Sequence, residues 1–205
     1  MHKEILSPEQ IALLPLLKQF KREFYLVGGT AIALQIGHRR SIDYDLFKKG
    51  EIRPKSILNK ISAAGFNFDI TRRVSEQLNI TVLKVKMTFF DYPYYVQPSI
   101  NFENIIRLPV LLDLGAMKAF AMGRRSKWKD YVDMYFLLRD FFSVEQISIR
   151  ASEIFGQLFS SKLFRAQLTF FDDIDYSETI EYLTTAPSDE EIKQFLLDKA
   201  LDVNF

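Results

Sequence analysis

The sequence predicts an α+β fold, in which a mixed β-sheet head with flanking helices over residues 1–108 precedes a helical bundle over residues 109–205. Short apolar runs and glycine turns alternate with helical patterns in the first part, whereas from residue 111 onward the apolar residues recur with a period of 3.6. A hydrophobic share of 48% and 19 Phe residues are sufficient to fill the core of such a chain. We therefore expect two successive parts of different architecture.

The first part is predicted to begin with a helix, because Ser7 is a suitable N-cap and Pro8 fits the first helical position. A short apolar strand over 24–27 follows. The remaining predicted elements are a turn at Gly28-Gly29, a helix over 30–36 that Gly37 ends, a strand over 42–47, a helix over 54–64, and strands over 66–73 and 79–90 with a hairpin connection at 74–78.

The second part is predicted to be wholly helical, because its apolar residues follow the helical period. The predicted helices cover residues 111–122, 127–142, 145–155, 162–171, 178–183 and 189–201.

The chain contains no Cys, which excludes disulfide bonds, thiolate zinc sites and cysteine nucleophiles and is typical of a reducing compartment. Its first ten residues lack the apolar segment of a signal peptide, and no stretch reaches the roughly 18 apolar residues of a membrane span. We expect a soluble cytoplasmic protein that has no membrane partner.

The formal net charge of +1 conceals an asymmetry along the chain. Residues 144–205 contain five Lys and Arg against twelve Asp and Glu, a balance of −7, which leaves +8 for residues 1–143 (22 against 14). The acidic segment can simply solvate its helices or lie against the basic part of its own chain. Alternatively, the basic part attracts a phosphate-bearing substrate and the acidic part meets a basic partner.

Asp43 and Asp45 occupy alternate positions of a predicted strand. Because alternate side chains of a strand point to one face, the two carboxylates are expected to project together, with Ile42, Tyr44 and Leu46 on the other face. Neighbouring carboxylates repel each other unless a cation, a donor or a shared proton holds them. The pair is therefore a predicted site for Mg²⁺ or Mn²⁺, which carboxylate oxygens bind.

Gly28 and Gly29 precede the predicted helix that begins at Thr30. Glycine allows a tight turn and a close approach of phosphate to the backbone, and a helix N-terminus offers amide N–H groups to an anion. The stretch from Gly28 to Asp45 therefore combines a predicted phosphate site with a predicted metal site.

The glycine pair, the following helix and the Asp-x-Asp strand together resemble the signature of the nucleotidyltransferase fold family. GGTAIALQIGHRRSIDYDLF, residues 28–47, resembles the first motif of AbiEii-type toxins, which are nucleotidyltransferases of bacterial abortive-infection and toxin–antitoxin systems. DLGAMKAFAMGRRSKWKDYVDMYFLL, residues 113–138, is similar to a helical motif of that family, and LTFFDDIDY, residues 168–176, to a further stretch. The resemblance covers most of the chain and implies a nucleotidyltransferase-like sheet.

The resemblance implies that Gly28 and Gly29 cradle a triphosphate, that Asp43 and Asp45 bind magnesium, and that Lys118 reaches the nucleotide phosphates. By the same resemblance, Thr30 belongs to the nucleotide-binding turn. These residues are expected to act together on a nucleoside triphosphate.

Asp130 or Asp133 is implied to complete the site from the helical part, and the two are expected to share a helix face because they are three residues apart. Lys118 lies on an otherwise apolar helix, where an ammonium needs an anionic partner. The alternatives are that Lys118 is a surface side chain and that the two aspartates merely pair with nearby basic residues at the surface.

The loop His38-Arg39-Arg40-Ser41 precedes the carboxylate strand. Arg39 is a candidate to balance the carboxylates or to hold a phosphate with two hydrogen bonds, and Ser41 to support the turn or bond Asp43. Arg40 is more easily explained as a solvated side chain and His38 as a structural donor.

Thr88 occupies the position where the family pattern suggests a third carboxylate, the group expected to activate the incoming hydroxyl. Threonine cannot act as that base. Asp91 at the end of the same strand and Asp69 on the preceding one are possible substitutes, if the strand register allows. Catalytic competence is therefore less strongly predicted than the fold.

Clustered phenylalanines such as Phe89 and Phe90 are expected to pack in the core rather than to stack on nucleobases. Tyr92, Tyr94 and Tyr95 are the better candidates for an exposed aromatic surface.

We expect a magnesium-dependent, AbiEii-like toxin that transfers a nucleotide from a nucleoside triphosphate to a hydroxyl of tRNA or protein and that has a cognate antitoxin. Two alternatives remain open: the same transfer to a small, antibiotic-like acceptor, and a module of this fold that binds nucleotide or a partner without turnover.

Overall fold

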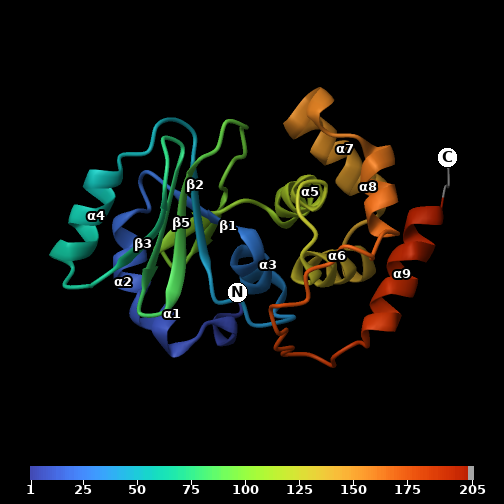
Figure 1. The fold of residues 1–205 in the computed structure, drawn as a ribbon, viewed down its shortest axis with the longest axis horizontal. Coiled ribbons are helices and arrows are strands. Elements are labelled where there is room, and N and C mark those ends of the chain that lie inside the picture. The colour runs from blue at the N-terminus through green and yellow to red at the C-terminus, as the bar shows by residue number, and fades with distance from the viewer. Residues whose placement is uncertain (203–205) are drawn as a thin grey trace. The chain divides into compact units, whose positions relative to one another are not determined.

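The computed structural model describes residues 1–202 and divides them into two compact units. The first unit is Met1–Val110, and the second begins at Leu111. In the described part of the chain the β-strands of both sheets belong to the first unit, and the second unit is built from helices and a long loop (Figure 1).

The first unit is built on a mixed sheet in which β2 and β5 are parallel and the other neighbouring pairs are antiparallel. α4 (Pro54–Ala63) and the β3–β4 pair lie between β2 and β5 along the chain, so these two neighbouring strands are far apart in sequence. In spatial order the strands are β1 (Tyr25–Val27), β2 (Tyr44–Lys48), β5 (Val85–Asp91), β4 (Gln77–Val82) and β3 (Asp69–Arg73).

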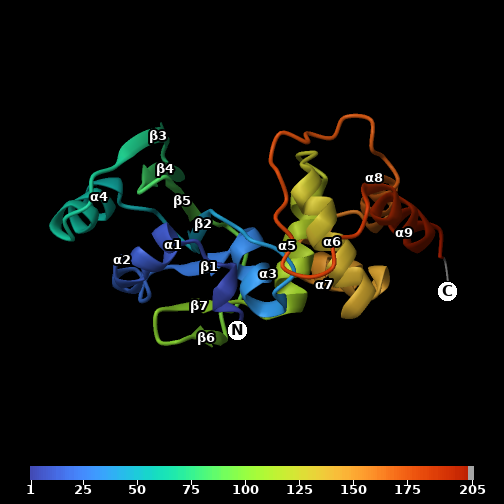
Figure 2. The same ribbon diagram turned by 90° about the horizontal axis from the view of Figure 1, so that it is seen from below.

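Short helices and a second hairpin complete this unit. The hairpin of β6 and β7 contacts β1 through β7, and Figure 2 shows it beside that strand. The elements are η1 (Lys3–Ile5), α1 (Pro8–Ala12), α2 (Leu14–Gln19), α3 (Gly28–Ile36), α4 (Pro54–Ala63), β6 (Ile100–Phe102) and β7 (Ile106–Leu108).

One face of the main sheet is an apolar core. Tyr44, Leu46, Met87 and Phe89 alternate along β2 and β5 and are fully buried. Phe89 packs edge-to-face on Phe20, which follows α2, with 5.0 Å between ring centroids. Such aromatic packing combines a large buried apolar area with favourable ring geometry. The N-terminal helices therefore anchor this face of the sheet.

The opposite face of the sheet carries polar side chains at the intervening positions. Asp45 of β2 pairs with Thr88 of β5, Thr88 with Asn79 of β4, and Asn79 with Arg72 of β3. Side chains directly opposite each other in neighbouring strands point to the same face. This face of the sheet is where the predicted carboxylate Asp45 lies.

The predicted single strand over 79–90 is wrong, because Leu83 and Lys84 turn the chain between β4 and β5. Both residues have positive φ, 48° and 67°, as a tight two-residue hairpin turn requires. Asn and Gly are the residues that usually signal such a turn, and neither occurs there. The sequence therefore gave no local indication of the turn.

The second unit consists of packed helices. Gly115 on α5 leaves room for Ile147 of α7, whose nearest side-chain carbon lies 3.6 Å from the position of an added Cβ. The helices are α5 (Leu111–Met122), α6 (Trp128–Asp140), α7 (Val144–Phe155), η2 (Gly156–Leu158), α8 (Ser161–Leu168) and α9 (Asp189–Leu201) (Figure 1).

The predicted helix over 178–183 is wrong, since the chain between α8 and α9 is a loop. Asp175 donates its backbone N–H to the Ser126 carbonyl and accepts from the Trp128 N–H, at 2.7 and 3.1 Å. Glu178 is paired with both Lys127 and Lys129. These partners outside the segment replace the backbone bonds of a helix.

None of the helices in residues 1–202 is long and apolar enough to cross a membrane.

Candidate functional site in the sheet unit and a buried ion network in the helical unit

Gly28 and Asp45 meet where β1 leads into α3. Val27 of β1 pairs with Asp45, and Gly28 is the first residue of α3 rather than part of a separate turn. Gly28 has φ +73°, and a Cβ added there would lie 2.2 Å from Asp45 Oδ2. Only glycine can adopt this conformation without strain and let the carboxylate approach so closely. The structure therefore brings the predicted phosphate and metal motifs together.

The N-terminus of α3 is suited to an anion. Its N-cap is Val27, whose side chain has no group that could bond the first amides, and Gly29 is the second residue of the helix. The first N–H groups of a helix lack carbonyl partners within the helix, and the helix dipole adds partial positive charge there. This helix end lies beside the Asp45 carboxylate. A phosphate group bound there could share a cation with that carboxylate.

Thr30 fixes the loop that leads to Asp45. Its hydroxyl is buried and hydrogen-bonds the Ser41 hydroxyl at 2.9 Å and the backbone carbonyl of Asp43. Ser41 is also buried. These contacts place Asp43 relative to α3, so Thr30 and Ser41 support the carboxylates from behind. Direct binding of nucleotide by either hydroxyl stays a prediction.

The strand that carries the two carboxylates is shorter than predicted. β2 begins at Tyr44, so Asp43 precedes it, and Ile42 is 57% exposed instead of sharing the buried face of Tyr44 and Leu46. The bonds of Thr30 to the loop replace strand pairing at this point. Asp43 and Asp45 are both half-buried. Strand alternation alone therefore does not account for the orientation of Asp43.

The basic loop before β2 is less exposed than a solvated loop would be. His38 and Arg39 are buried, and the Arg39 guanidinium donates to the Arg40 carbonyl at 2.9 Å. Arg40 donates to the carbonyls of Glu4 and Leu6, both at 3.2 Å. Arg40 thereby ties the N-terminal segment to this loop. Contact of Arg39 with phosphate stays a prediction.

Thr88 lies directly beside Asp45 on the neighbouring strand. The position at which the family resemblance implies a third carboxylate is therefore adjacent to Asp45. The possible substitutes lie elsewhere. Asp91 is at the end of β5, in register with Lys48, and accepts the Gly50 N–H at 2.8 Å. Asp69 is exposed on β3, two strands away from β5. The register therefore places neither carboxylate next to Asp45.

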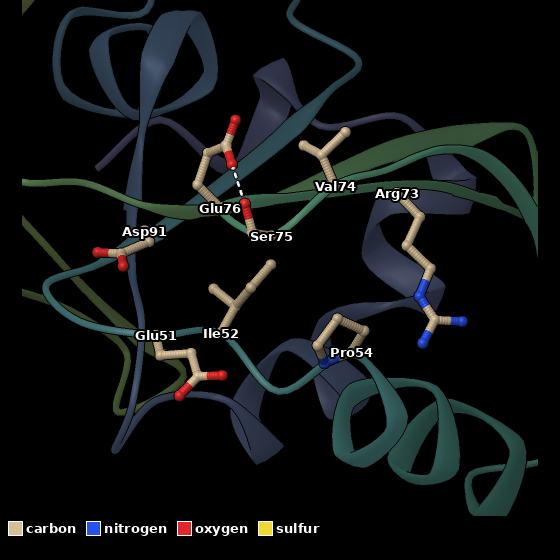
Figure 3. Close-up of a pocket in the computed structure, with 8 residues that line it drawn as sticks. All are labelled: Glu51, Ile52, Pro54, Arg73, Val74, Ser75, Glu76 and Asp91. Carbon is tan, nitrogen blue, oxygen red and sulfur yellow. Dashed lines mark hydrogen bonds between the residues drawn. The ribbon is translucent and has the colours of Figure 1, made fainter.

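A hollow of about 740 Å³ lies at the turn between β3 and β4 and the start of α4. Figure 3 shows Asp91, Glu51 and Glu76 around it, with Arg73 at the α4 side. Glu76 accepts a hydrogen bond from the Ser75 hydroxyl at 2.5 Å. Asp45 and Gly28 do not line this hollow, so it is separate from the motif at the start of α3.

In the helical unit, Lys118, Asp130 and Asp133 form a buried ion network. Lys118 Nζ lies 2.7 Å from Asp130 Oδ1 and 2.8 Å from Asp133 Oδ2, and all three side chains are at most 4% exposed. Arg125 Nε reaches Asp130 Oδ2 at 2.8 Å, and the Arg125 side chain is 51% exposed. The three predicted residues of this unit are therefore brought together, and Lys118 is not a surface lysine.

In this network two cations, Lys118 and Arg125, pair with two carboxylates, Asp130 and Asp133. Burial alone would raise the pKa of Asp130, but Lys118 and Arg125 outweigh this effect and hold its pKa below the usual range. Arg125 also lines a hollow of about 540 Å³ together with Lys127 and Asp175. The network therefore reaches solvent through Arg125.

The sequence interpretation missed the half-buried side chains that surround Asp45 and Thr88 on the same face. These are Phe47, Phe90, Gln77 and Asn79. Tyr92, predicted to be exposed, is buried against Phe47, whereas Tyr95 is 70% exposed. For Gln77 and Asn79 the sequence does contain a signal, because they alternate with the apolar Leu78 and Ile80, which are buried. A strand predicted to begin at residue 79 does not use this alternation.

The first part of the chain is similar to a known family. Residues 15–116 match the sequence profile of the nucleotidyl transferase AbiEii toxin family, type IV toxin–antitoxin system. This segment contains Gly28, Asp43, Asp45 and Thr88.

An uncharacterized protein of Aquifex aeolicus (strain VF5) is 32% identical over 124 residues, which is 57% of this chain and 58% of that protein. The match thus spans less than two thirds of the relative's length. The similarity is therefore to part of each protein.

Two solved structures share the fold. A candidate nucleotidyltransferase from H. pylori aligns with a TM-score of 0.60 at 16% identity, over 95% of this chain and 94% of that one. MenT4, a nucleotidyltransferase toxin from Mycobacterium tuberculosis H37Rv, aligns with a TM-score of 0.59 at 14% identity, over 94% and 81%. The predicted α+β, nucleotidyltransferase-like fold is thereby confirmed.

Proposed function

The chain belongs, through residues 15–116, to the nucleotidyl transferase AbiEii toxin family, and from this premise we propose that it is a magnesium-dependent nucleotidyltransferase toxin. It transfers a nucleotide from a nucleoside triphosphate to a hydroxyl group of an acceptor, either tRNA or a protein. The family and the nucleotidyltransferase fold support an enzyme of this class.

The observation that carries this proposal is the contact between Gly28 and Asp45. The Asp45 carboxylate lies against the Cα of the residue that begins α3, so that amide donors and a carboxylate meet at one point. A triphosphate held at the amides of α3 would present its phosphates to the cation that Asp43 and Asp45 bind. Gly28, Gly29, Asp43 and Asp45 are the residues to which we assign this role.

The reaction is an in-line displacement at the α-phosphorus of the triphosphate. The acceptor oxygen forms a bond to that phosphorus, the bond to the bridging oxygen breaks, and pyrophosphate leaves with the bonding electrons. Because such transfers depend mainly on positioning and charge neutralisation, Gly, Asp, Lys and Arg side chains are suited to them. The proton of the acceptor hydroxyl passes to water, since Thr88 cannot accept it.

The donor set fits a magnesium ion. Asp43 and Asp45 supply hard carboxylate oxygens beside an anion-binding helix end, and within residues 1–202 there is no cluster of three or more His, Cys, Asp or Glu that could hold a metal by itself. Magnesium commonly takes one or two carboxylates and completes its shell with water and substrate phosphates. When bound, the ion would neutralise charge on the phosphates and on the leaving pyrophosphate.

For the helical unit we propose that Lys118 contacts nucleotide phosphate and that Asp130 and Asp133 hold its ammonium in place. The buried network supports the positioning part of this role, because the ammonium is fixed by two carboxylates at 2.7 and 2.8 Å. If a phosphate oxygen replaced one of the two aspartates as a partner of Lys118, the buried ammonium would still be paired with an anion. Lys118→Met is expected to weaken nucleotide binding in a titration with a non-hydrolysable triphosphate.

A second function is favoured by one observation, the threonine beside Asp45. With Thr88 where an activating carboxylate would stand, the same site could bind nucleotide or a partner without turnover. Tight nucleotide binding without release of pyrophosphate for any acceptor would favour this function over transfer.

The toxin part of the proposal is tested by induced expression in a bacterial host. We expect growth to stop with the wild-type chain and to continue with Asp45→Ala. Asp69→Ala is the matched control, because it removes an exposed carboxylate from the edge strand β3 and should leave toxicity unchanged. A co-expressed antitoxin should restore growth. Equal toxicity of wild type and Asp45→Ala would contradict the proposal.

A further inference from the structure

Two phenylalanines lie two residues further along the strands than Asp45 and Thr88, and therefore on the same sheet face. Phe47 of β2 pairs with Phe90 of β5, and their ring centroids are 5.2 Å apart. Both rings are half-buried. Phe89, on the other face, is fully buried against Phe20 and Phe24. On the face of Asp45, Phe47 and Phe90 also contact the buried Tyr92, at 5.0 and 6.1 Å between ring centroids. Unlike Phe89 and Tyr92, Phe47 and Phe90 are only partly buried, so part of their surface stays exposed beside the carboxylate.

Two amide side chains continue this surface onto β4. Gln77 pairs with Phe90 and Asn79 with Thr88, so both lie on the face of Asp45. Gln77 Nε2 donates to Asn79 Oδ1 at 2.9 Å. This bond orients the two amides. Gln77 Oε1, an acceptor, and Asn79 Nδ2, a donor, take no part in it and can bond other groups. We call Phe47, Phe90, Gln77 and Asn79 the aromatic–amide patch.

Aromatic rings together with a fixed amide donor and acceptor are the chemistry that binds a nucleobase. The rings offer stacking surface to any base, and amides hydrogen-bond the edges of bases. We propose that the aromatic–amide patch is the subsite for the nucleobase of the acceptor nucleotide. This inference rests on the proposed nucleotide transfer and specifies its acceptor as a nucleic acid end.

The order of the strands assigns the patch to the acceptor rather than to the triphosphate. Gly28 and the start of α3 lie at the β1 side of β2, whereas Phe90, Gln77 and Asn79 lie on the other side of β2, on β5 and β4. A triphosphate at α3 and an acceptor at the patch would approach Asp45 from opposite sides. An in-line displacement likewise needs the attacking and the leaving oxygen on opposite sides of the phosphorus.

The test is equilibrium binding of short oligoribonucleotides to the full chain, without nucleoside triphosphate. The oligonucleotides differ only in the nucleotide with the free 3′ hydroxyl, which carries a base or is abasic. We expect the base-bearing end to bind at least about fivefold more tightly, as stacking of one base provides. Equal affinity for both ends would overturn the subsite.

Variants locate the effect. Phe90→Leu and Asn79→Ala should remove most of the difference between the two ends, and two variants of different chemistry guard against one that fails to fold. Lys86→Ala is the matched control, because Lys86 is exposed on the same strand and face, on the other side of Thr88. Persistence of the difference in both patch variants, or its loss in Lys86→Ala, would overturn the assignment.

A second titration identifies the source of the base. Non-hydrolysable triphosphates should bind wild type and Phe90→Leu with affinities within about twofold of each other. A loss confined to the triphosphate would assign the patch to the incoming nucleotide and overturn the acceptor subsite. Discrimination between oligonucleotide ends by a protein that transfers nothing would count against the transferase and in favour of the subsite, so the two failures are distinguishable.

Discussion

Gly28 has two separate reasons to be glycine, and a single substitution tests both. An alanine at this position would lose about 1–2 kcal/mol of stability because of the φ of +73°. Its Cβ would also lie 2.2 Å from Asp45 Oδ2, so the carboxylate would have to move away. Because misplacing a reacting group by about 1 Å can cost roughly 100-fold in rate, Gly28→Ala is expected to lose transfer at least to that extent. The measurement is pyrophosphate release together with the free energy of unfolding.

Gly65→Ala is the control for Gly28→Ala. Gly65 has a comparable φ of +81°, but an added Cβ would meet nothing within 4 Å. We expect a similar loss of stability, about 1 kcal/mol, and unchanged transfer. An equal loss of activity in both variants would mean that backbone strain, rather than contact with Asp45, explains the effect.

Asp130 makes the stability of the helical unit depend on pH. Its pKa in the folded protein is held below the usual range, so its contribution is complete at neutral pH and is lost as the pH falls through the folded pKa. Asp130→Asn is expected to lower the free energy of unfolding by about 3 kcal/mol at pH 7, because Arg125 and part of Lys118 lose their partner. Chemical denaturation at pH 7 and pH 3 should show the difference from wild type shrinking in acid.

Asp140→Asn is the control on the same helix. The Arg139–Asp140 pair at the end of α6 is partly exposed, and such pairs contribute at most about 1 kcal/mol. The prediction for Asp130 is wrong if the two variants lose the same stability or if the loss in Asp130→Asn does not change with pH.

Among the strands, the pairing of β2 with β5 is tested by restoring a carboxylate. Thr88→Asp would place a second carboxylate beside Asp45, at the strand spacing of about 4.8 Å. We expect repulsion to lower the melting temperature by roughly 2–4 °C without metal and millimolar Mg²⁺ to reverse the change. Thr88→Asn should show no such magnesium response. If Mg²⁺ does not change the melting temperature of Thr88→Asp, the proposed metal site is contradicted.

The turn between β4 and β5 stores an avoidable strain. Leu83 and Lys84 both adopt the left-handed conformation, and Leu83 is largely exposed. Replacing the pair by Asn-Gly, the residues that prefer this turn, is expected to raise the free energy of unfolding by about 1 kcal/mol. Thermal denaturation checks this. A lower stability would show that the turn is not of this type.

Helix ends could be predicted from the sequence, whereas the turn between β4 and β5 could not. Ser7, Gly37 and the apolar period fixed helix ends well: Ser7 caps α1, Gly37 ends α3 with φ 71°, and α5 and α9 have their predicted bounds. Leu83 and Lys84 carry no turn signal, because the fold imposes their conformation. The helix predicted over 178–183 is wrong for a related reason, because the loop between α8 and α9 is held by partners distant in sequence.

The candidate site was predicted where chemistry is local in the sequence. Gly28 and Asp45 follow from a spaced motif, and the structure brings them into contact. The position of Thr88 beside Asp45 depends on a parallel pairing that no local pattern specifies. Pairing between Lys118 and two aspartates likewise depends on how α5 and α6 pack. Contacts between distant segments were therefore the part that the sequence left open.

At the scale of the whole molecule, the chain combines a nucleotidyltransferase-like unit with a helical unit, and the two structural neighbours align with 94% or more of its length. The helical unit is thus part of the shared fold and not an appendage. We propose that it contributes Lys118, Asp130 and Asp133 to nucleotide binding. Part of the balance of −7 over residues 144–205 is neutralised within the chain, because Lys127 pairs with Asp175 and Glu178, and Lys129 pairs with Glu178.

The central claim is that Asp43 and Asp45 bind the metal for nucleotide transfer. The most direct measurement incubates the protein with α-labelled nucleoside triphosphates, Mg²⁺ and total RNA and follows the label. We predict labelled acceptor and released pyrophosphate with the wild-type chain, and neither with Asp43→Ala, with Asp45→Ala or in the presence of a chelator. Labelling that persists unchanged in the two aspartate variants would contradict the account.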